Sequence, residues 1–315
     1  MSELIRLQNL SCFFELGRGQ RVHAVDNVSL SIAQGETLGL VGESGSGKST
    51  LGKTIMGLND KTAGSVSYRG EVLPAHYRSQ DFRRMAPLMQ MIFQDPYSSL
   101  NPRMTVGEII AEGLRLRNGA KAGVGQWLEK VGLSASHASR YPHEFSGGQR
   151  QRIGIARALI MEPEFVVCDE PISALDVSVQ AQVVNLLNEL KQSMGLTLLF
   201  IAHDLSMVRY ISDRMAVMYL GSIVELGDAR DVYFRPKHPY TEVLIASNPE
   251  PDPQAERQRL STPIQGEIPS PVNVPPGCRF AGRCPKVMPV CREKTPELIQ
   301  LVNEERLVAC HLYSS

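Results

Sequence analysis

The chain has 315 residues, of which 43% are hydrophobic, and this fits one large globular domain with an appendage, or two domains. Its 33 Lys and Arg residues balance its 33 Asp and Glu residues, which argues against bulk attraction to nucleic acid or anionic lipid. No apolar stretch approaches the roughly 18 residues that span a bilayer, and residues 1–10 lack a signal-peptide pattern, so we expect a cytoplasmic protein that meets the membrane through a partner.

Residues 3–41 alternate apolar and polar positions, with turn signals at 17–19 and 34–35, and predict several short strands. The last of these strands, over 37–41, leads directly into a glycine-rich run. A helix-compatible segment follows that run over residues 51–58. Strand, glycine-rich turn and helix are the context in which a phosphate-binding loop occurs.

The run itself fits the pattern G-x-x-x-x-G-K-[ST] of such a loop, also called Walker A; it reads Gly42-Glu43-Ser44-Gly45-Ser46-Gly47-Lys48-Ser49-Thr50. Glycines allow the backbone N–H groups to surround a polyphosphate, and the helix adds its positive N-terminal end. Lys48 can reach the β- and γ-phosphates, and the Ser49 hydroxyl can ligate Mg²⁺. The alternative, a chance glycine-rich turn, does not explain the flanking strand and helix.

Further along the chain, strands alternate with helices, which indicates a parallel sheet with helices on its faces. Strands are predicted over 65–68, 89–93, 165–168, 196–202 and 215–219, a mostly helical region over 105–158, and helices over 179–193 and 205–211. The proline-rich residues 248–253 predict a linker. We therefore divide the chain into a nucleotide-binding domain, 1–247, and a C-terminal extension, 248–315.

An acidic pair, Asp169 and Glu170, follows the apolar strand predicted over 165–168. Asp169 ends that strand at the edge where open α/β sheets bind ligands, so it can hold Mg²⁺ directly or through water. Glu170 can orient or deprotonate an attacking water. Alone, such a pair is usually a solvated turn, but about 120 residues after a phosphate loop it predicts a metal ligand and a catalytic base.

A second glycine-containing run, Phe145-Ser146-Gly147-Gly148-Gln149-Arg150-Gln151-Arg152, precedes the acidic pair by about 20 residues. It resembles the signature motif of ATP-binding-cassette (ABC) proteins, in which a helix N-terminus binds the γ-phosphate of a nucleotide held by a second subunit. The resemblance implies nucleotide contacts from Ser146, Gly147, Gly148 and Gln149. A plain loop with two glycines would not require this position in the chain.

The other motifs of that family follow in order. Gln94 matches the glutamine of the Q-loop, Asp176 ends a match to the D-loop, and His203 matches the switch histidine that contacts the γ-phosphate. The resemblance implies Lys48, Gln94, Glu170 and His203 as catalytic residues and Ser49, Gln94 and Asp169 as Mg²⁺ ligands. The adenine is expected to stack on an aromatic ring of the first strands, with Phe14 as the best match and Phe13 as the alternative.

The resemblance covers essentially the whole chain and implies an active ATPase that works as a pair of subunits. It implies an α/β P-loop core with a mainly parallel sheet, an antiparallel β subdomain, a helical subdomain at about 95–160 and a Cys-rich C-terminal extension. Segments 93–103, 140–146, 236–241 and 266–278 look like the dipeptide/oligopeptide/nickel importer branch.

That branch implies particular partners and a particular place in the cell. The partners are two transmembrane permeases, a second ATPase subunit (a related chain or a second copy) and, indirectly, an extracytoplasmic solute-binding protein, with no nucleic acid. The place is the cytoplasmic face of a bacterial inner membrane. The expected solute is a di- or oligopeptide, with nickel or another small solute as the alternative.

Four of the six cysteines fall after residue 277, with the spacing C-x₅-C-x₆-C-x₁₈-C: Cys278, Cys284, Cys291 and Cys310. In a reducing compartment such a group favours metal over disulfides, and all-cysteine ligation suits zinc or an iron–sulfur cluster. By resemblance to similar tails in the branch we expect a [4Fe–4S] cluster, with Zn²⁺ as the alternative and His311 as a less favoured fourth ligand. Unliganded thiols are the remaining possibility.

Two other classes of function are alternatives to transport. Soluble ABC ATPases that act on DNA or the ribosome usually carry long coiled coils or two cassettes, whereas this chain has one cassette, no heptad insert and no net positive charge. A regulatory module that senses ATP and redox state through the cysteines is the other alternative.

Overall fold

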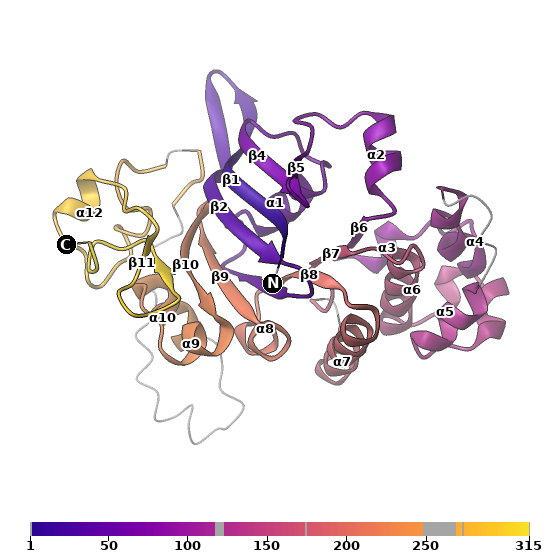
Figure 1. Ribbon diagram of the computed structural model, residues 1–315. Coiled ribbons are helices and arrows are strands. Elements are labelled where there is room, and N and C mark those ends of the chain that lie inside the picture. The colour runs from indigo at the N-terminus through magenta and orange to yellow at the C-terminus, as the bar shows by residue number, and fades with distance from the viewer. Residues whose placement is uncertain (1, 117–122, 174, 248–268, 273, 315) are drawn as a thin grey trace.

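Figure 1 shows a computed structural model of the chain, which describes residues 2–116, 123–173, 175–247, 269–272 and 274–314. The predicted linker at 248–253 lies outside the described residues. The described strands form two sheets, one of four strands and one of eight. No helix among the described residues is both long enough and apolar enough to span a bilayer.

The smaller sheet is antiparallel, in the order β2-β1-β4-β5. Its strands are β1 (Glu3–Gly17), β2 (Gln20–Ala33), β4 (Ala63–Tyr68) and β5 (Glu71–Val72). The predicted strands over 3–41 and the turns between them are confirmed, but β1 and β2 are long, not short, and pair along most of their length (Figure 1). Register shifts within this ladder allow the two strands to stay paired across irregular stretches.

The larger sheet has the order β11-β12-β10-β9-β3-β8-β7-β6. Five neighbouring strands run parallel: β9 (Arg214–Tyr219), β3 (Thr37–Val41), β8 (Thr197–Ile201), β7 (Phe165–Asp169) and β6 (Met89–Ile92). Antiparallel strands extend one edge: β10 (Ser222–Asp228), β12 (Leu307–Val308) and β11 (Ile299–Gln300). The predicted parallel sheet is therefore confirmed, and it continues as a mixed sheet.

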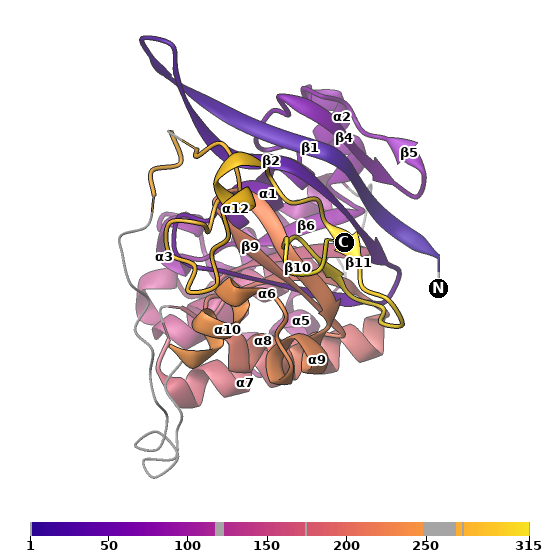
Figure 2. The same cartoon turned by 90° about the vertical axis from the view of Figure 1, so that its left-hand side faces the viewer.

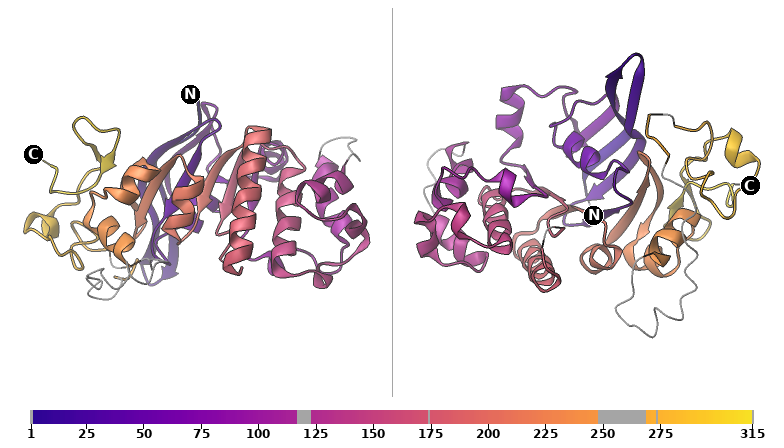
Figure 3. Two further views of the ribbon diagram at one scale, coloured as in Figure 1. Left: turned by 90° about the horizontal axis from the view of Figure 1, so that it is seen from below. Right: turned by 180° about the vertical axis from the view of Figure 1, so that it is seen from behind.

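The parallel strands β3, β8 and β7 are buried on both faces, as their mainly apolar sequences require. In β7, Phe165 and Val167 face the core beneath the smaller sheet, whereas Val166 and Cys168 face the core on the opposite side. Helix α1 (Lys48–Ile55) packs between the two sheets. Helices α6 (Gly147–Leu159), α7 (Val177–Met194) and α8 (Leu205–Ile211) cover the other face (Figure 3).

The mostly helical pattern predicted over 105–158 is confirmed. It contains α4 (Val106–Ala111), η1 (Gly113–Leu116), α5 (Val124–Lys130), η2 (Ala135–Ser139), η3 (Pro142–Glu144) and α6, preceded by α2 (Ser79–Met85) and α3 (Pro96–Ser99). These helices lie at one end of the molecule, and the C-terminal segment lies at the other (Figures 1 and 3). The remaining helices are α9 (Ala229–Phe234), α10 (Pro239–Ala246) and α12 (Val290–Glu293).

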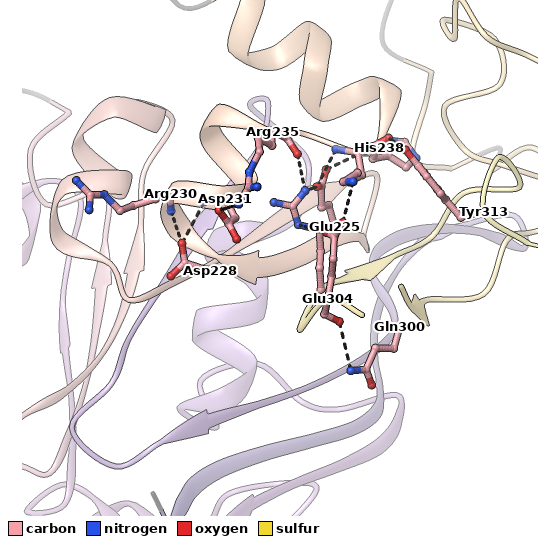
Figure 4. Close-up of polar contacts among 11 residues, drawn as sticks. Glu225, Asp228, Arg230, Asp231, Arg235, His238, Gln300, Glu304 and Tyr313 are labelled. Carbon is pink, nitrogen blue, oxygen red and sulfur yellow. Dashed lines mark hydrogen bonds and ion pairs between the residues drawn. The ribbon is translucent and has the colours of Figure 1, made fainter. Parts of the chain in front are cut away.

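The C-terminal segment, defined here as residues 269–314, packs against the strands of the core (Figure 2). Its strand β12 pairs with β10, and a buried ion pair joins Arg306 to Glu225, which are 3% and 0% exposed. The Glu225 carboxylate also accepts the backbone N–H groups of Lys237 and His238 (Figure 4). Removing one member of such a buried pair leaves the other charge unpaired and typically costs about 3–5 kcal/mol.

His238 is buried at the start of α10, where its Nδ1 accepts the N–H of Tyr240 and caps the helix. Burial lowers the pKa of His238 to about 4, so the ring is neutral in the folded protein at pH 5. In the unfolded chain a histidine has a pKa of about 6.5. Stability from this group is therefore complete above about pH 6.5 and is lost as the pH falls toward 4.

We predict that lowering the pH from 7 to 5 lowers the free energy of unfolding by about 2 kcal/mol, because His238 becomes protonated in the unfolded chain but stays neutral in the folded protein. His238→Asn keeps a helix-capping acceptor but cannot be protonated, so its denaturant-unfolding free energy should fall less over the same interval. Parallel losses in the two proteins would show that His238 is not the titrating group. The exposed His76 provides the matched control, because His76→Asn should retain the wild-type pH dependence.

Candidate functional site

Four neighbouring parallel strands bring the predicted site residues to one edge of the large sheet. The order β3-β8-β7-β6 places the carboxyl ends of these strands side by side. The phosphate loop follows β3, His203 follows β8, Glu170 follows β7 and Gln94 follows β6. Ligands of open α/β sheets bind at this edge.

The first and last glycines of the loop are required by close backbone contacts. Gly42 has a φ of +154°, and a Cβ there would come within 2.2 Å of the Met218 carbonyl oxygen. Gly47 has a φ of +103°, and a Cβ there would come within 1.9 Å of the Ala24 carbonyl oxygen. Any larger residue would displace the loop from β2 and β9, so the loop shape depends on these two glycines.

The polar side chains of the loop are held close to its backbone. The Lys48 ammonium donates to the carbonyl oxygens of Gly42 and Glu43, at 2.8 and 2.9 Å. Burial lowers the pKa of Lys48, and the charges of Glu170, Asp169 and Glu43 offset this effect. The Ser46 hydroxyl is buried and has no hydrogen-bond partner among the described residues. Such an unpaired group fits a loop built to receive an anion.

Ser49 and Asp169 lie together, although 120 positions separate them in the sequence: the Ser49 Oγ donates to Asp169 Oδ1 at 2.7 Å. Burial raises the pKa of Asp169, and the hydrogen bond from Ser49 acts in the opposite direction. Hydroxyl and carboxylate oxygens are the protein ligands that Mg²⁺ prefers, so the pair fits the predicted ion.

Glu170 stands at the centre of the remaining predicted catalytic group. Gln94 Nε2 donates to Glu170 Oε2 at 3.1 Å, and His203 Nδ1 lies 3.5 Å from the same oxygen. Glu170 also has a φ of +45°, in the left-handed region that non-glycine residues rarely adopt. This backbone turn immediately after β7 directs a carboxylate into the site, and strain of this kind is concentrated at functional positions.

These residues line one cavity of about 550 Å³. Its lining includes loop residues Ser44, Gly45, Gly47, Lys48, Ser49 and Thr50, together with Phe14, Gln94, Glu170 and His203. Phe14 is 42% exposed and lines the cavity, whereas Phe13 packs on His23 with ring centroids 4.2 Å apart. Phe14 is therefore the better placed of the two candidates for stacking an adenine.

The predicted signature residues do not line this cavity. Ser146 is exposed and caps α6, accepting the N–H of Gln149 at 3.3 Å while Gln149 Oε1 accepts the N–H of Ser146 at 3.0 Å. Asp176 is also exposed and begins α7. A Cβ on Gly148 would lie 2.5 Å from Val179, so the starts of α6 and α7 pack together. The two motifs thus form a second polar surface, away from the loop.

Several cavity residues were not predicted. Val22 and Ala24 of β2 contribute to the lining, as does Pro271 of the C-terminal segment, whose carbonyl oxygen accepts the His23 N–H. No short pattern marks Val22 and Ala24, because they are ordinary strand residues. Pro271 lies in segment 266–278, which suggested the importer branch. The sequence of that segment does not show that it lies close to the phosphate loop.

The four C-terminal cysteines affect one another's pKa, but they do not form a metal-ion site. Burial raises the pKa of Cys278 to about 11, and the charges of Cys291, Cys310 and Cys284 add to this effect. Nevertheless, no group of three or more His, Cys, Asp or Glu side chains in the described parts of the chain is arranged to hold a metal ion. The structure therefore gives no support to zinc or to the predicted [4Fe–4S] cluster. His311 instead has its Nε2 2.8 Å from the Lys294 carbonyl oxygen.

Comparison with family models identifies two regions. Residues 25–173 match the model described as ABC transporter, and residues 224–291 match the model described as oligopeptide/dipeptide transporter, C-terminal region. The second match begins within β10, before the predicted domain boundary at 247.

Curated relatives match over nearly their full length. YkfD of Bacillus subtilis is 56% identical over 98% of this chain and 95% of its own. The oligopeptide transport ATP-binding protein OppF of Salmonella typhimurium is 50% identical, with coverages of 94% and 92%. Among solved structures, the ATP-binding cassette MJ0796, in a dimeric post-hydrolysis state with ADP and phosphate, aligns with a TM-score of 0.66 and 28% identity, covering 72% of this chain and 99% of that one.

We predict that Phe14→Leu weakens ATP binding about tenfold, because base–aromatic stacking typically contributes 1–3 kcal/mol. Phe13→Leu is the matched control, since Phe13 belongs to the same strand but packs on His23. Titration with a fluorescent ATP analogue would measure both dissociation constants. A larger loss in Phe13→Leu than in Phe14→Leu would reverse the assignment.

Proposed function

The chain belongs to the ABC transporter family, and we propose that it is the ATP-hydrolysing subunit that powers import of di- and oligopeptides. Identity of 50–56% to relatives that include oligopeptide transport ATP-binding proteins, over nearly the whole of both chains, carries this conclusion. The cavity agrees with it, because every predicted catalytic residue lies on its wall.

We propose that the triphosphate of ATP lies in the phosphate loop, with its adenine on Phe14. Loop N–H groups and Lys48 would bind the phosphate oxygens, and the Ser46 hydroxyl would gain a partner there. Ser49 and Asp169 would hold Mg²⁺, with Gln94 nearby as the third predicted ligand. The ion would neutralise charge on the phosphates.

Hydrolysis would then use the group centred on Glu170. A water molecule attacks the γ-phosphorus, the bond from that phosphorus to the β–γ bridging oxygen breaks, and ADP leaves. Glu170 accepts the proton of the attacking water, while Gln94 and His203 position the carboxylate through its Oε2. His203 is 62% exposed, so it is free to turn from Glu170 toward the γ-phosphate when ATP binds.

A second ATPase subunit, either a copy of this chain or a related one, would complete the site. Ser146, Gly147, Gly148 and Gln149 lie outside the cavity at the exposed start of α6, beside Asp176. An exposed helix N-terminus, at which the N–H groups of Gly147 and Gly148 take no part in the cap of Ser146 and Gln149, suits a γ-phosphate presented by another subunit. The MJ0796 cassette was likewise solved as a dimer.

Movement of the helical subdomain would reach the permeases through the segment that follows Gln94. Arg157 donates to the carbonyl oxygen of Ser99, and the Arg150 guanidinium lies 3.6 Å from the centre of the exposed Tyr97 ring. Both arginines belong to α6, the signature helix, so a shift of α6 must move residues 93–99. The importer would comprise two transmembrane permeases, this ATPase subunit at the cytoplasmic face of the inner membrane, and an extracytoplasmic binding protein.

Glu170→Gln removes the proton acceptor and keeps its size and its hydrogen-bonding capacity. We expect at least a hundredfold loss of ATP turnover with ATP binding retained, and a stable closed dimer in the presence of ATP. The matched control is Glu189→Gln, the same change on the exposed side of α7. Phosphate release and size-exclusion chromatography measure both effects, and undiminished turnover would refute the role given to Glu170.

We also propose a [4Fe–4S] cluster, which rests on the number and spacing of the four cysteines in the sequence, since the described side chains form no metal-ion site. Their raised pKa values keep Cys278, Cys284 and Cys310 protonated in the metal-free state, so loading would release protons. Protein purified without oxygen is expected to absorb visible light and to contain iron and acid-labile sulfide in equal amounts. Colourless protein with one bound zinc, or with no metal, would overturn the proposal.

A further inference from the structure

The C-terminal segment reaches the phosphate loop through one ion pair. The guanidinium of Arg283 donates two hydrogen bonds to the carboxylate of Glu43, the second residue of the loop, at 2.7 and 2.9 Å. Arg283 lies between Cys278 and Cys284 in a part of the chain that follows the cassette. The pair therefore joins positions 240 residues apart in sequence.

This contact is unlike the other ion pairs of the segment, because it is both bidentate and buried. The side chains of Arg283 and Glu43 are 5% and 17% exposed, whereas those of Lys286 and Glu242, which also join the segment to the core, are 47% and 35% exposed. A third hydrogen bond runs from Arg283 to the Tyr219 hydroxyl at 3.3 Å. Paired donors in a dry setting fix geometry as well as charge.

Glu43 in turn determines the shape of the loop. Its backbone N–H donates to the hydroxyl of the buried Tyr240 at 2.9 Å, and its carbonyl oxygen accepts from the Lys48 ammonium at 2.9 Å. The same carbonyl accepts the N–H of Ser46 at 3.2 Å. The backbone of Glu43 is therefore hydrogen-bonded to Ser46 and Lys48 within the loop and to Tyr240 of α10.

The charge of Glu43 creates a second requirement. A carboxylate in the phosphate loop, beside a site for a triphosphate, repels the ligand unless a cation neutralises it. Lys48 cannot serve both purposes, since its ammonium is needed by the phosphates. Arg283 is the group that pairs with the Glu43 side chain in the described structure, and its burial limits screening by salt.

We propose that Arg283 is a positioning residue for ATP: from the C-terminal segment it holds Glu43, neutralises it and so keeps the phosphate loop in its binding shape. The inference rests on the proposed function, because it presumes that the loop binds ATP. It gives the segment a direct part in nucleotide binding. A cassette without Arg283 would carry an uncompensated carboxylate beside the triphosphate.

The test is a set of dissociation constants for MgATP, with the full-length chain. Arg283→Gln should weaken binding about tenfold, because breaking one side of a buried, hydrogen-bonded pair leaves the other charge unpaired. Glu43→Gln combined with Arg283→Gln removes both charges, and affinity should return to within about threefold of wild type. Lys286→Gln, which breaks the exposed pair of the same segment, should leave affinity unchanged.

The variant Arg283→Lys distinguishes the effect of the positive charge from the effect of the bidentate hydrogen bonds. It keeps the positive charge but loses the bidentate contact, so its affinity should fall between those of the wild type and Arg283→Gln. A purely structural role would instead lower the melting temperature of Arg283→Gln and of the double variant alike, with no recovery of affinity in the double variant.

The possible outcomes distinguish failure of the proposed function from failure of the role proposed for Arg283. Wild-type protein that does not bind MgATP would contradict the proposed function itself. Wild-type protein that binds MgATP, together with folded Arg283→Gln of equal affinity, would overturn the role of Arg283 alone. Should Arg283→Gln not fold, Arg283→Lys decides, and wild-type affinity in that variant overturns the proposal.

Discussion

The negative charge of a triphosphate is the constraint around which this structure is organised. The backbone N–H groups of the loop after β3 and the Lys48 ammonium would bind the phosphate oxygens, in a cavity at the carboxyl edge of the parallel strands. The loop reaches that shape only because Gly42 and Gly47 allow the backbone to pass within contact distance of Met218 and Ala24. Both neighbours belong to strands, so the two sheets together fix the loop.

The surrounding elements add charges and contacts to that loop. The acidic pair at the end of β7 supplies one carboxylate that binds Ser49 and another that binds Gln94. In the C-terminal segment, Arg283 pairs with Glu43 of the loop, and Pro271 lines the cavity. The buried pair of Glu225 and Arg306 fastens this segment to the large sheet. The segment is thus part of the surroundings of the nucleotide site, as well as an extension of the core.

Much of this could be predicted from the sequence, because the decisive residues lie in short, ordered patterns. The loop after β3, the Asp-Glu pair after β7 and His203 after β8 each follow an apolar run that forms a buried strand. The carboxyl ends of parallel strands meet at one edge, so the convergence of these residues follows from the fold class. The length of β1 and β2 was missed, because bulges interrupt an alternation that the ladder continues through.

Long-range pairs could not be predicted, since neither partner carries a local signal. Arg283 and Glu43 are 240 positions apart, and nothing in the residues around Arg283 indicates which carboxylate it meets. Strands β11 and β12 have two residues each, too few to show a period, yet they continue the large sheet. The cysteine spacing suggested a metal centre, but the described side chains form no metal-ion site, because spacing alone does not set distances in a segment with so little regular structure.

The most direct test is a crystal structure of the protein with Mg²⁺ and a non-hydrolysable ATP analogue. We predict the three phosphates within the loop of residues 42–50, the base against Phe14, and Ser146 of a second subunit facing the γ-phosphate. An analogue bound elsewhere, with the loop empty, or held by one subunit whose γ-phosphate faces solvent, would contradict it.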